Sequence, residues 1–270
     1  MQNPTYDEIF QRNIGVFTPE EQEKIKNLNI AIIGVGGLGA PVAEGLARLG
    51  VGELRLVEPD TYEVSNLNRQ TGAYLDTLGR NKAEVMAEFV RRINPGIKLT
   101  VKTTKLFGEE LRELISGCDV VIDGIDYFNI DEELELHRIA KELKIPIVSE
   151  QACFSVISFS LYETEKSALS DLINGEDFLE RIEQATRLFF PIFPIELTEE
   201  IMANMFKSYL FGQGVIGLPS YSVNSSITGA VVTKYIISYL IKTEQKNFLP
   251  IMPDILYLDT NELEFKRVFR

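Results

Sequence analysis

The sequence predicts an α/β fold built on a doubly wound, mainly parallel sheet that antiparallel strands extend. Three observations lead to this prediction. Short apolar runs of strand length alternate with amphipathic helical stretches over residues 29–149, an order typical of parallel sheets with right-handed crossovers. A glycine-rich loop directly follows the first apolar run. Residues 155–163 alternate apolar and polar side chains, as an antiparallel strand does.

Local signals place the individual elements. Residues 18–21 form a capping box with proline at the first helical position, which opens a short helix that ends near Asn27. The helix expected at 80–93 stops before Asn94, Pro95 and Gly96. We expect the parallel strands at 29–33, 53–57, 98–103, 120–122 and 145–149, and further helices at 40–49, 109–116, 131–143 and 220–241. The tail, 255–269, is expected to form two strands around a turn at 259–261.

Composition and charge exclude several classes of protein. The chain has 270 residues, of which 45% are hydrophobic and 25% are charged, which is ordinary for a globular protein. Its net charge of −13 argues against a general nucleic-acid binder. Cys118 and Cys153 form neither a metal-ligand pair nor a disulfide framework. The N-terminus lacks an apolar core, and the apolar stretch 229–241 is short and contains Lys234. We therefore expect a cytoplasmic protein without a membrane span.

The glycine loop predicts an anion site. Gly34, Gly36, Gly37 and Gly39 lie between an expected strand and an expected helix, where backbone N–H groups and the helix dipole favour a phosphate. Glu58 ends the next expected strand, the position from which a Rossmann-like fold binds ribose hydroxyls. The glycines alone also fit an NAD-dependent oxidoreductase or a tight turn that binds nothing.

A polar cluster favours ATP over NAD. Residues 66–70 place the cation of Arg69 among amides, shortly after the glycine loop. NAD carries a closed pyrophosphate and needs no such group. An enzyme that cleaves ATP between its α and β phosphates does need one, because the charge of the transition state and of the leaving pyrophosphate must be neutralised. No hydride-handling histidine or Tyr–Lys pair is visible.

Together these motifs resemble the ThiF/MoeB/HesA family, the adenylating fold shared with ubiquitin-activating enzymes. The resemblance covers roughly residues 10–150 and rests on the segments 32–40, 58–60, 64–70, 79–82, 93–95 and 121–126, with a weaker match at 214–219 and in the helix that follows. It implies ATP- and magnesium-dependent adenylation of a carboxylate, with release of pyrophosphate. The substrate it implies is the C-terminus of a ubiquitin-like or sulfur-carrier protein.

The resemblance also implies which residues form the site. By this resemblance, Arg69 and Lys82 bind the ATP phosphates, and Asp126 binds the magnesium ion. Arg12 reaches into the site of a neighbouring subunit. The remaining residues that it assigns to the nucleotide are Gly34, Gly36, Gly37, Gly39, Glu58, Asp60 and Asn66. This role of Arg12 implies a homodimer. Plainer interpretations remain open: a surface ion pair for Arg69, a solvated helix start for Lys82, a helix N-cap for Asp126 and simple exposure for Arg12.

The chain departs from the family at three positions. Glu58 stands where Asp is usual, Tyr127 where Asn is usual, and Asp131 where many members have Arg. These changes leave room for another acyl substrate, on modified tRNA or on a peptide, or for a catalytically silent binding subunit. The net charge disfavours tRNA, although Arg91, Arg92, Lys102 and Lys105 can make a local basic patch.

The remaining expectations concern metals, cysteine chemistry and domains. No pair of C-x-x-C motifs exists, so we expect no zinc. Region 166–218 contains no cysteine, which favours adenylation without an enzyme thioester; Cys153 is expected to be a small hydrophobe on a strand. The only histidine, His137, is expected to be structural or exposed. The aromatic segment 189–193 is expected to be core, dimer interface or a cover for the acyl substrate. We expect an N-terminal helical segment (1–27), a nucleotide-binding half (28–151) and a second half (152–270) containing the crossover region 166–218 and the C-terminal strands.

Overall fold

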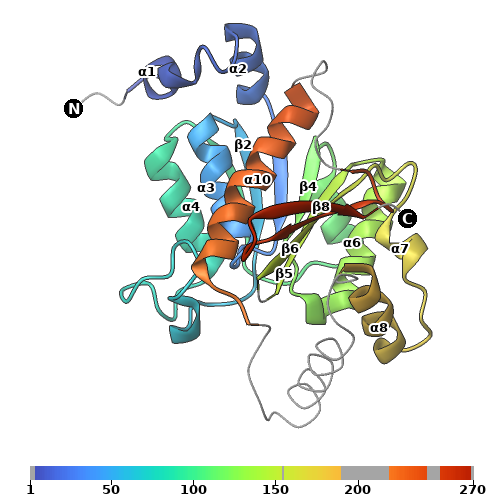
Figure 1. The fold of residues 1–270 in the computed structure, drawn as a ribbon. Helices are drawn as coiled ribbons and strands as arrows, with labels where there is room; N and C mark the ends of the chain where they lie inside the picture. Colours follow the sequence, from blue (N-terminus) through green and yellow to red (C-terminus); the bar gives the residue numbers. More distant parts are fainter. Residues whose placement is uncertain (1–3, 154, 190–218, 242–249, 269–270) are drawn as a thin grey trace.

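The computed structural model describes residues 4–153, 155–189, 219–241 and 250–268. These residues form one 8-stranded sheet in the order β3-β2-β1-β4-β5-β6-β7-β8, with helices on both faces (Figure 1). Strands β1 to β5 pair in parallel, and β5 to β8 pair antiparallel. The predicted fold class is confirmed.

The elements have the following bounds. The strands are β1 (Asn29–Ile33), β2 (Glu53–Val57), β3 (Lys98–Lys102), β4 (Val120–Asp123), β5 (Ile147–Cys153), β6 (Val156–Tyr162), β7 (Ile255–Asp259) and β8 (Glu264–Val268). The α-helices are α1 (Tyr6–Phe10), α2 (Pro19–Lys26), α3 (Gly39–Leu49), α4 (Lys82–Ile93), α5 (Gly108–Ile115), α6 (Ile130–Leu143), α7 (Leu169–Leu172), α8 (Phe178–Phe189) and α10 (Ser222–Ile241). Short 3-10 turns are η1 (Gln11–Asn13), η2 (Val64–Asn66) and η3 (Tyr127–Asn129).

The strand order fixes where a ligand site forms. β1 lies between β2 and β4, and its last residue, Ile33, is in register with Val57 and Asp123, the last residues of those two strands. The chain therefore leaves three neighbouring strands at one edge of the sheet. Open α/β sheets bind ligands at such an edge, where the connections diverge to opposite faces.

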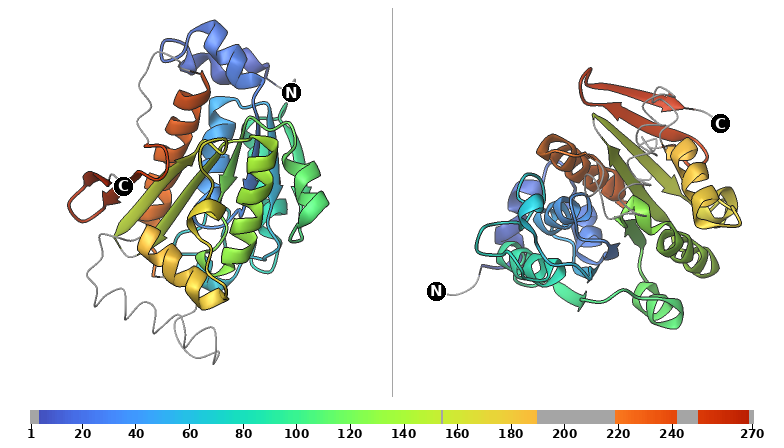
Figure 2. Two further views of the ribbon diagram at one scale, coloured as in Figure 1. Left: turned by 90° about the vertical axis from the view of Figure 1, so that its right-hand side faces the viewer. Right: turned by 90° about the horizontal axis from the view of Figure 1, so that it is seen from below.

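Two layers of helices cover the sheet. Helices α3, α4 and α10 pack on one face, and α5, α6 and α8 pack on the other (Figure 2). Small residues let α3 and α10 approach closely: a Cβ on Gly45 would lie 2.4 Å from Thr233 Oγ1, and a Cβ on Gly229 would lie 2.7 Å from that of Pro41. Across the described ranges, no helix has the combination of length and apolar character that a membrane crossing requires.

The N-terminal segment is anchored at the far end of α3. Tyr6 Oη donates a hydrogen bond to the carbonyl of Gly50 at 2.8 Å, and Gln22 Nε2 donates to that of Leu49 at 2.9 Å. Both carbonyls belong to the C-terminal end of α3, whereas its N-terminal end joins the glycine loop. Helices α1 and α2 therefore lie opposite the carboxyl edge of the sheet.

Strand β5 runs further than the sequence indicated. It was expected to end at residue 149 but continues to Cys153, because it pairs antiparallel with β6 down to the Cys153–Val156 pair. One sheet thus continues across the expected boundary at residue 151, and the division into two halves stays an expectation. Phe189 is buried; the rest of the aromatic segment, 190–193, and the weak motif at 214–218 lie outside the described residues.

Candidate active site

A cavity of about 390 Å³ opens at the carboxyl ends of β1, β2 and β4. Its size is that of a small-molecule site. Most of the residues that the family resemblance assigns to the nucleotide, the phosphates or magnesium line it: Gly34, Gly36, Gly37, Glu58, Asp60, Arg69, Lys82 and Asp126. Gly39, Asn66 and Arg12 are not part of its lining.

The glycines of the loop have two different functions. Gly34 has a φ of +94°, and a Cβ there would lie 2.1 Å from the carbonyl oxygen of Gly124. A Cβ on Gly39 would lie 2.0 Å from the carbonyl oxygen of Gly34. These two residues allow the turn itself. A Cβ on Gly36 or Gly37 would meet nothing closer than 3.4 Å, so these two leave the floor of the cavity open.

The start of α3 faces this floor without a side-chain cap. The helix begins at Gly39, its N-cap is Leu38, and within the described part of the chain no side chain caps the free N–H groups there. Leu38 itself lines the cavity. Unsatisfied backbone N–H groups and the positive end of the helix dipole favour an anion at this position.

Lys82 brings a buried cation to the same cavity. It is the first residue of α4 and is only 7% exposed, so the solvated interpretation does not hold. Its Nζ lies 3.6 Å from Asp60 Oδ2, and the described residues give it no hydrogen bond. A buried ammonium without hydrogen-bond acceptors is costly. The position therefore suits a bound anion.

Glu58 connects the glycine loop with the segment after β2. Its two carboxylate oxygens accept hydrogen bonds from the N–H groups of Val35 at 2.9 Å and Asp60 at 3.0 Å. Burial raises the pKa of Glu58, while the nearby charge of Lys82 opposes that rise. Each oxygen keeps a further lone pair that can accept from a ribose hydroxyl. This contact stays a prediction.

Arg69 lies against the glycine loop. A Cβ on Gly37 would be 3.4 Å from Arg69 Nε, while Arg69 Nη1 donates to the carbonyl of Ser65 at 3.1 Å and to Asn68 Oδ1 at 2.9 Å. Burial lowers the pKa of Arg69, and the charge of Asp126 acts in the opposite direction. The guanidinium is therefore held at the cavity wall.

Asn66 shapes the turn that presents Arg69. Its Oδ1 accepts from the N–H of Glu63 at 3.0 Å, and its carbonyl accepts from the N–H groups of Arg69 and Gln70. The side chain is buried and does not line the cavity. A direct contact between Asn66 and the nucleotide stays a prediction.

Asp126 is exposed at the rim of the cavity. Its Oδ1 accepts from the N–H of Phe128 at 3.1 Å, so it does cap η3, as the plainer interpretation held. That bond uses one of about four acceptor sites of a carboxylate. Magnesium is typically held by one or two carboxylates and several waters. An exposed carboxylate at the rim of this cavity is of the type that holds this ion.

Arg12 lies away from the cavity of its own chain. It is exposed in η1, in the N-terminal segment that is anchored at the opposite end of α3. Its contribution to a neighbouring subunit's site stays a prediction.

Two ion pairs near the cavity join residues that are distant in sequence. Lys105, which the sequence placed in a basic patch, pairs with Glu132 of α6, and both line the cavity. Asp131, where the family often has Arg, pairs at 2.8 Å with Nε of Arg181 from α8. The guanidinium of Arg181, on another helix, thus lies next to the position where the family often has Arg. No local sequence signal links these partners.

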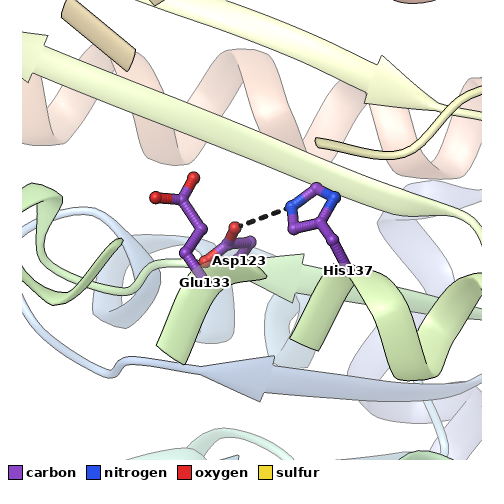
Figure 3. Close-up of side chains that lie close together, drawn as sticks. All are labelled: Asp123, Glu133 and His137. Atoms are coloured by element: carbon purple, nitrogen blue, oxygen red, sulfur yellow. Dashed lines mark hydrogen bonds and ion pairs between the residues drawn. The ribbon is translucent and has the colours of Figure 1, made fainter. Parts of the chain in front are cut away.

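A buried polar cluster lies beneath the cavity. Asp123, at the end of β4, and Glu133 and His137, on α6, are all fully buried (Figure 3). Glu150 on β5 is buried beside them. Burial, followed by the charge of Asp123, raises the pKa values of both glutamates well above their usual range. A sequence signal existed: Glu133 and His137 fall on the same helix face as the buried Leu136 and Ala140.

The fold and this cavity define a doubly wound α/β protein with a candidate phosphate site. Comparison with known proteins places the chain in a family. The chain belongs to the ThiF family, whose model matches residues 10–250. This membership confirms the resemblance seen in the sequence.

Relatives and solved structures add detail. The chain is 35% identical over 145 residues (53% of this chain, 55% of the relative) to the tRNA threonylcarbamoyladenosine dehydratase of Haemophilus influenzae. It is 35% identical over 131 residues (48% and 51%) to the sulfur carrier protein ThiS adenylyltransferase of Escherichia coli. The chain thus spans about half the length of the curated relatives it matches. The E. coli MccB structure shares the fold, with a TM-score of 0.71, 17% identity and coverage of 98% of this chain and 72% of that one.

Proposed function

We propose that this protein uses ATP to adenylate a carboxylate and releases pyrophosphate. The observation that carries the proposal is the pair of cations, Arg69 and Lys82, that faces one cavity beside the uncapped start of α3. A triphosphate would supply the acceptors that the buried Lys82 lacks. Membership of the ThiF family and the similarity to an adenylyltransferase support the same activity.

In the proposed reaction, a carboxylate oxygen of the substrate attacks the α-phosphorus of ATP. The bond between this phosphorus and the oxygen that bridges to the β-phosphorus breaks, and its electron pair leaves with pyrophosphate. Arg69 offers a planar fork to non-bridging oxygens, and Lys82 a point charge. With the N–H groups of α3, they stabilise the charge that develops on the phosphates. Asp126 would hold Mg²⁺, which when bound neutralises part of that charge.

The proposed substrate is the C-terminus of a ubiquitin-like or sulfur-carrier protein. The similarity to the ThiS adenylyltransferase supports this class. We also propose that the protein works as a homodimer, because Arg12 lies at the end of α3 opposite to its own cavity. In a homodimer, Arg12 would complete the cavity of the second copy.

The test is exchange of labelled pyrophosphate into ATP. Exchange should require both Mg²⁺ and a small carrier protein that ends in Gly-Gly. Arg69→Ala should lower the exchange rate on the order of 10³-fold, by analogy with other arginines that neutralise phosphoryl charge. Arg138→Ala, on an exposed part of α6, is the matched control and should exchange normally. Undiminished exchange in Arg69→Ala would refute this role, and ATP binding without exchange for any carrier would indicate a binding-only subunit.

A tRNA-borne carboxylate is the second candidate substrate. The relative from H. influenzae is a tRNA-modifying dehydratase by name. Arg91, Arg92 and Lys102 are exposed, although Lys105 is engaged by Glu132. tRNA binding that weakens steeply with salt would support this substrate. The absence of binding at low salt would eliminate it.

A further inference from the structure

A buried chain of hydrogen bonds connects α7 with the rim of the cavity. The N–H of Leu169, the first residue of α7, donates to His137 Nδ1 at 3.3 Å. His137 Nε2 lies 3.0 Å from Asp123 Oδ2 (Figure 3). Asp123 Oδ1 accepts from the N–H of Ile125 at 3.2 Å. Ile125 and its neighbour Asp126 both line the cavity.

These hydrogen bonds determine the tautomer of His137. Because Nδ1 accepts a hydrogen bond from Leu169, it carries a lone pair, and the proton of the neutral imidazole is on Nε2. Nε2 therefore donates to Asp123. The atoms of Asp123, Glu133 and His137 that could ligate a metal all lie within 4.8 Å of one another. A metal bound here would need a lone pair on His137 Nε2. Because Nε2 carries the proton, it has no free lone pair, which argues against a metal site.

Asp123 lies among other buried carboxyl groups. Glu133 and Glu150 are fully buried; Glu133 interacts with Asp123, and neither carboxyl oxygen of Glu150 has a hydrogen-bond partner among the described residues. Burial raises the pKa of both groups, and the charge of Asp123 raises it further, which favours their neutral forms. One carboxyl oxygen of Asp123 lies against His137 Nε2, and the other accepts from the N–H of Ile125. Removing either donor would leave a buried oxygen of Asp123 without a partner and release the turn after β4.

We propose that His137 is a positioning residue for the nucleotide site: through Asp123 it holds the turn 124–126, so that the carboxylate of Asp126 meets the Mg²⁺ that accompanies ATP. This role rests on the proposed function. Asp126 is exposed and belongs to a short turn, so its position depends on what the turn is tied to. Groups that orient a metal ligand in this way commonly contribute about 10- to 100-fold to metal affinity.

Two substitutions separate the two ends of the imidazole. His137→Asn keeps a polar atom near Leu169 and loses the donor to Asp123, whereas His137→Gln keeps a donor that can reach Asp123. Ile139→Val is the control, because Ile139 is fully buried on the same helix and belongs to the apolar core. Calorimetric titration with ATP over a series of Mg²⁺ concentrations measures binding without any acyl substrate. Thermal melting of each protein gives its stability.

The expected result is a change in Mg²⁺ dependence that stability does not explain. His137→Asn should raise the Mg²⁺ concentration for half-maximal ATP binding about tenfold, while His137→Gln stays near the wild-type value. Ile139→Val should keep the wild-type value despite a lower melting temperature. A wild-type Mg²⁺ dependence in His137→Asn, or equal effects of Asn and Gln, would overturn the positioning role.

Two further results have defined consequences. If His137→Asn does not fold, Asp123→Asn replaces it with the same expectation. The amide has only one acceptor oxygen, so it cannot accept hydrogen bonds at both positions where the carboxylate accepts from His137 and from Ile125. If the wild-type protein binds no ATP at any Mg²⁺ concentration, the proposed function fails, and the role of His137 fails with it. ATP binding in the wild type with an unchanged His137→Asn overturns the positioning role alone.

Discussion

The guanidinium of Arg69 packs over Gly37, with Nε 3.4 Å from the position that a Cβ of residue 37 would occupy. This relationship couples the glycine loop to a segment that follows the next strand. The cation and the open backbone floor therefore face the same space, which is the arrangement that a phosphate group requires.

The first prediction separates the two kinds of glycine in the loop. Gly37→Ala should fold normally, because its Cβ meets no atom closer than 3.4 Å, yet ATP affinity should fall about tenfold or more as the methyl group raises the floor. Gly34→Ala should instead lose stability, since its Cβ would lie 2.1 Å from the Gly124 carbonyl oxygen. Calorimetry with ATP and thermal melting measure both effects. Unchanged ATP affinity in Gly37→Ala would contradict the assignment of the floor.

The second prediction concerns Lys82. Lys82→Met removes a buried ammonium whose ion-pair partner, Asp60, is 3.6 Å away with a side chain 70% exposed. Stability without ligand should stay the same or rise, because burying such a charge is costly. The melting temperature of the wild type should rise with ATP, and that of the variant should rise far less. Lys24→Met, at an exposed position on α2, is the matched control and should keep the ATP-dependent rise. An equal rise in Lys82→Met would show that the ammonium does not bind the nucleotide.

The third prediction is a pH dependence that arises from Glu150. Its pKa in the folded protein is raised by burial from the ordinary value of 4.5. At a pH between the ordinary pKa of 4.5 and the raised pKa of the folded state, Glu150 holds a proton in the folded protein that the unfolded chain has lost. The stability that this group contributes is therefore fully present below about pH 4.5 and is lost as the pH rises through the folded-state pKa. Glu150→Gln keeps the shape and removes this titration, so its melting temperature should fall less than that of the wild type as the pH rises above about 4.5. Glu113→Gln, at an exposed position, should melt like the wild type, and identical pH curves for Glu150→Gln would refute the prediction.

The fourth prediction tests the ion pair between Asp131 and Arg181. Arg181 is the more buried partner, with 21% of its side chain exposed against 62% for Asp131, and its Nη1 also donates to the carbonyls of Gly175 and Glu176. Arg181→Met should therefore cost about 1–3 kcal/mol of unfolding free energy, and Asp131→Asn less than about 1 kcal/mol. Urea unfolding measures both. A larger loss for Asp131→Asn would show that the pair, and not the anchoring of α8, dominates.

Local pattern predicted the elements of the fold well. The strand 29–33, the glycine loop and the helix after it were placed from apolar runs, glycines and caps, and the structure has β1 (Asn29–Ile33) and α3 (Gly39–Leu49) there. The end of β5 was wrong by four residues, because a strand's length depends on its partner, here β6. Asn66 was placed near the phosphates, yet its side chain is used within its own turn.

The sequence by itself determined the fold class, the family and the residue types that can bind a polyphosphate, because these follow from short-range patterns. Only the tertiary structure decided which groups meet. Three contacts each join residues from different segments: the ion pair of Lys105 with Glu132, the ion pair of Arg181 with Asp131, and the buried contact of His137 with Asp123. Such contacts depend on how helices pack across the sheet and on the cost of leaving a buried charge unpaired, and no local pattern encodes either.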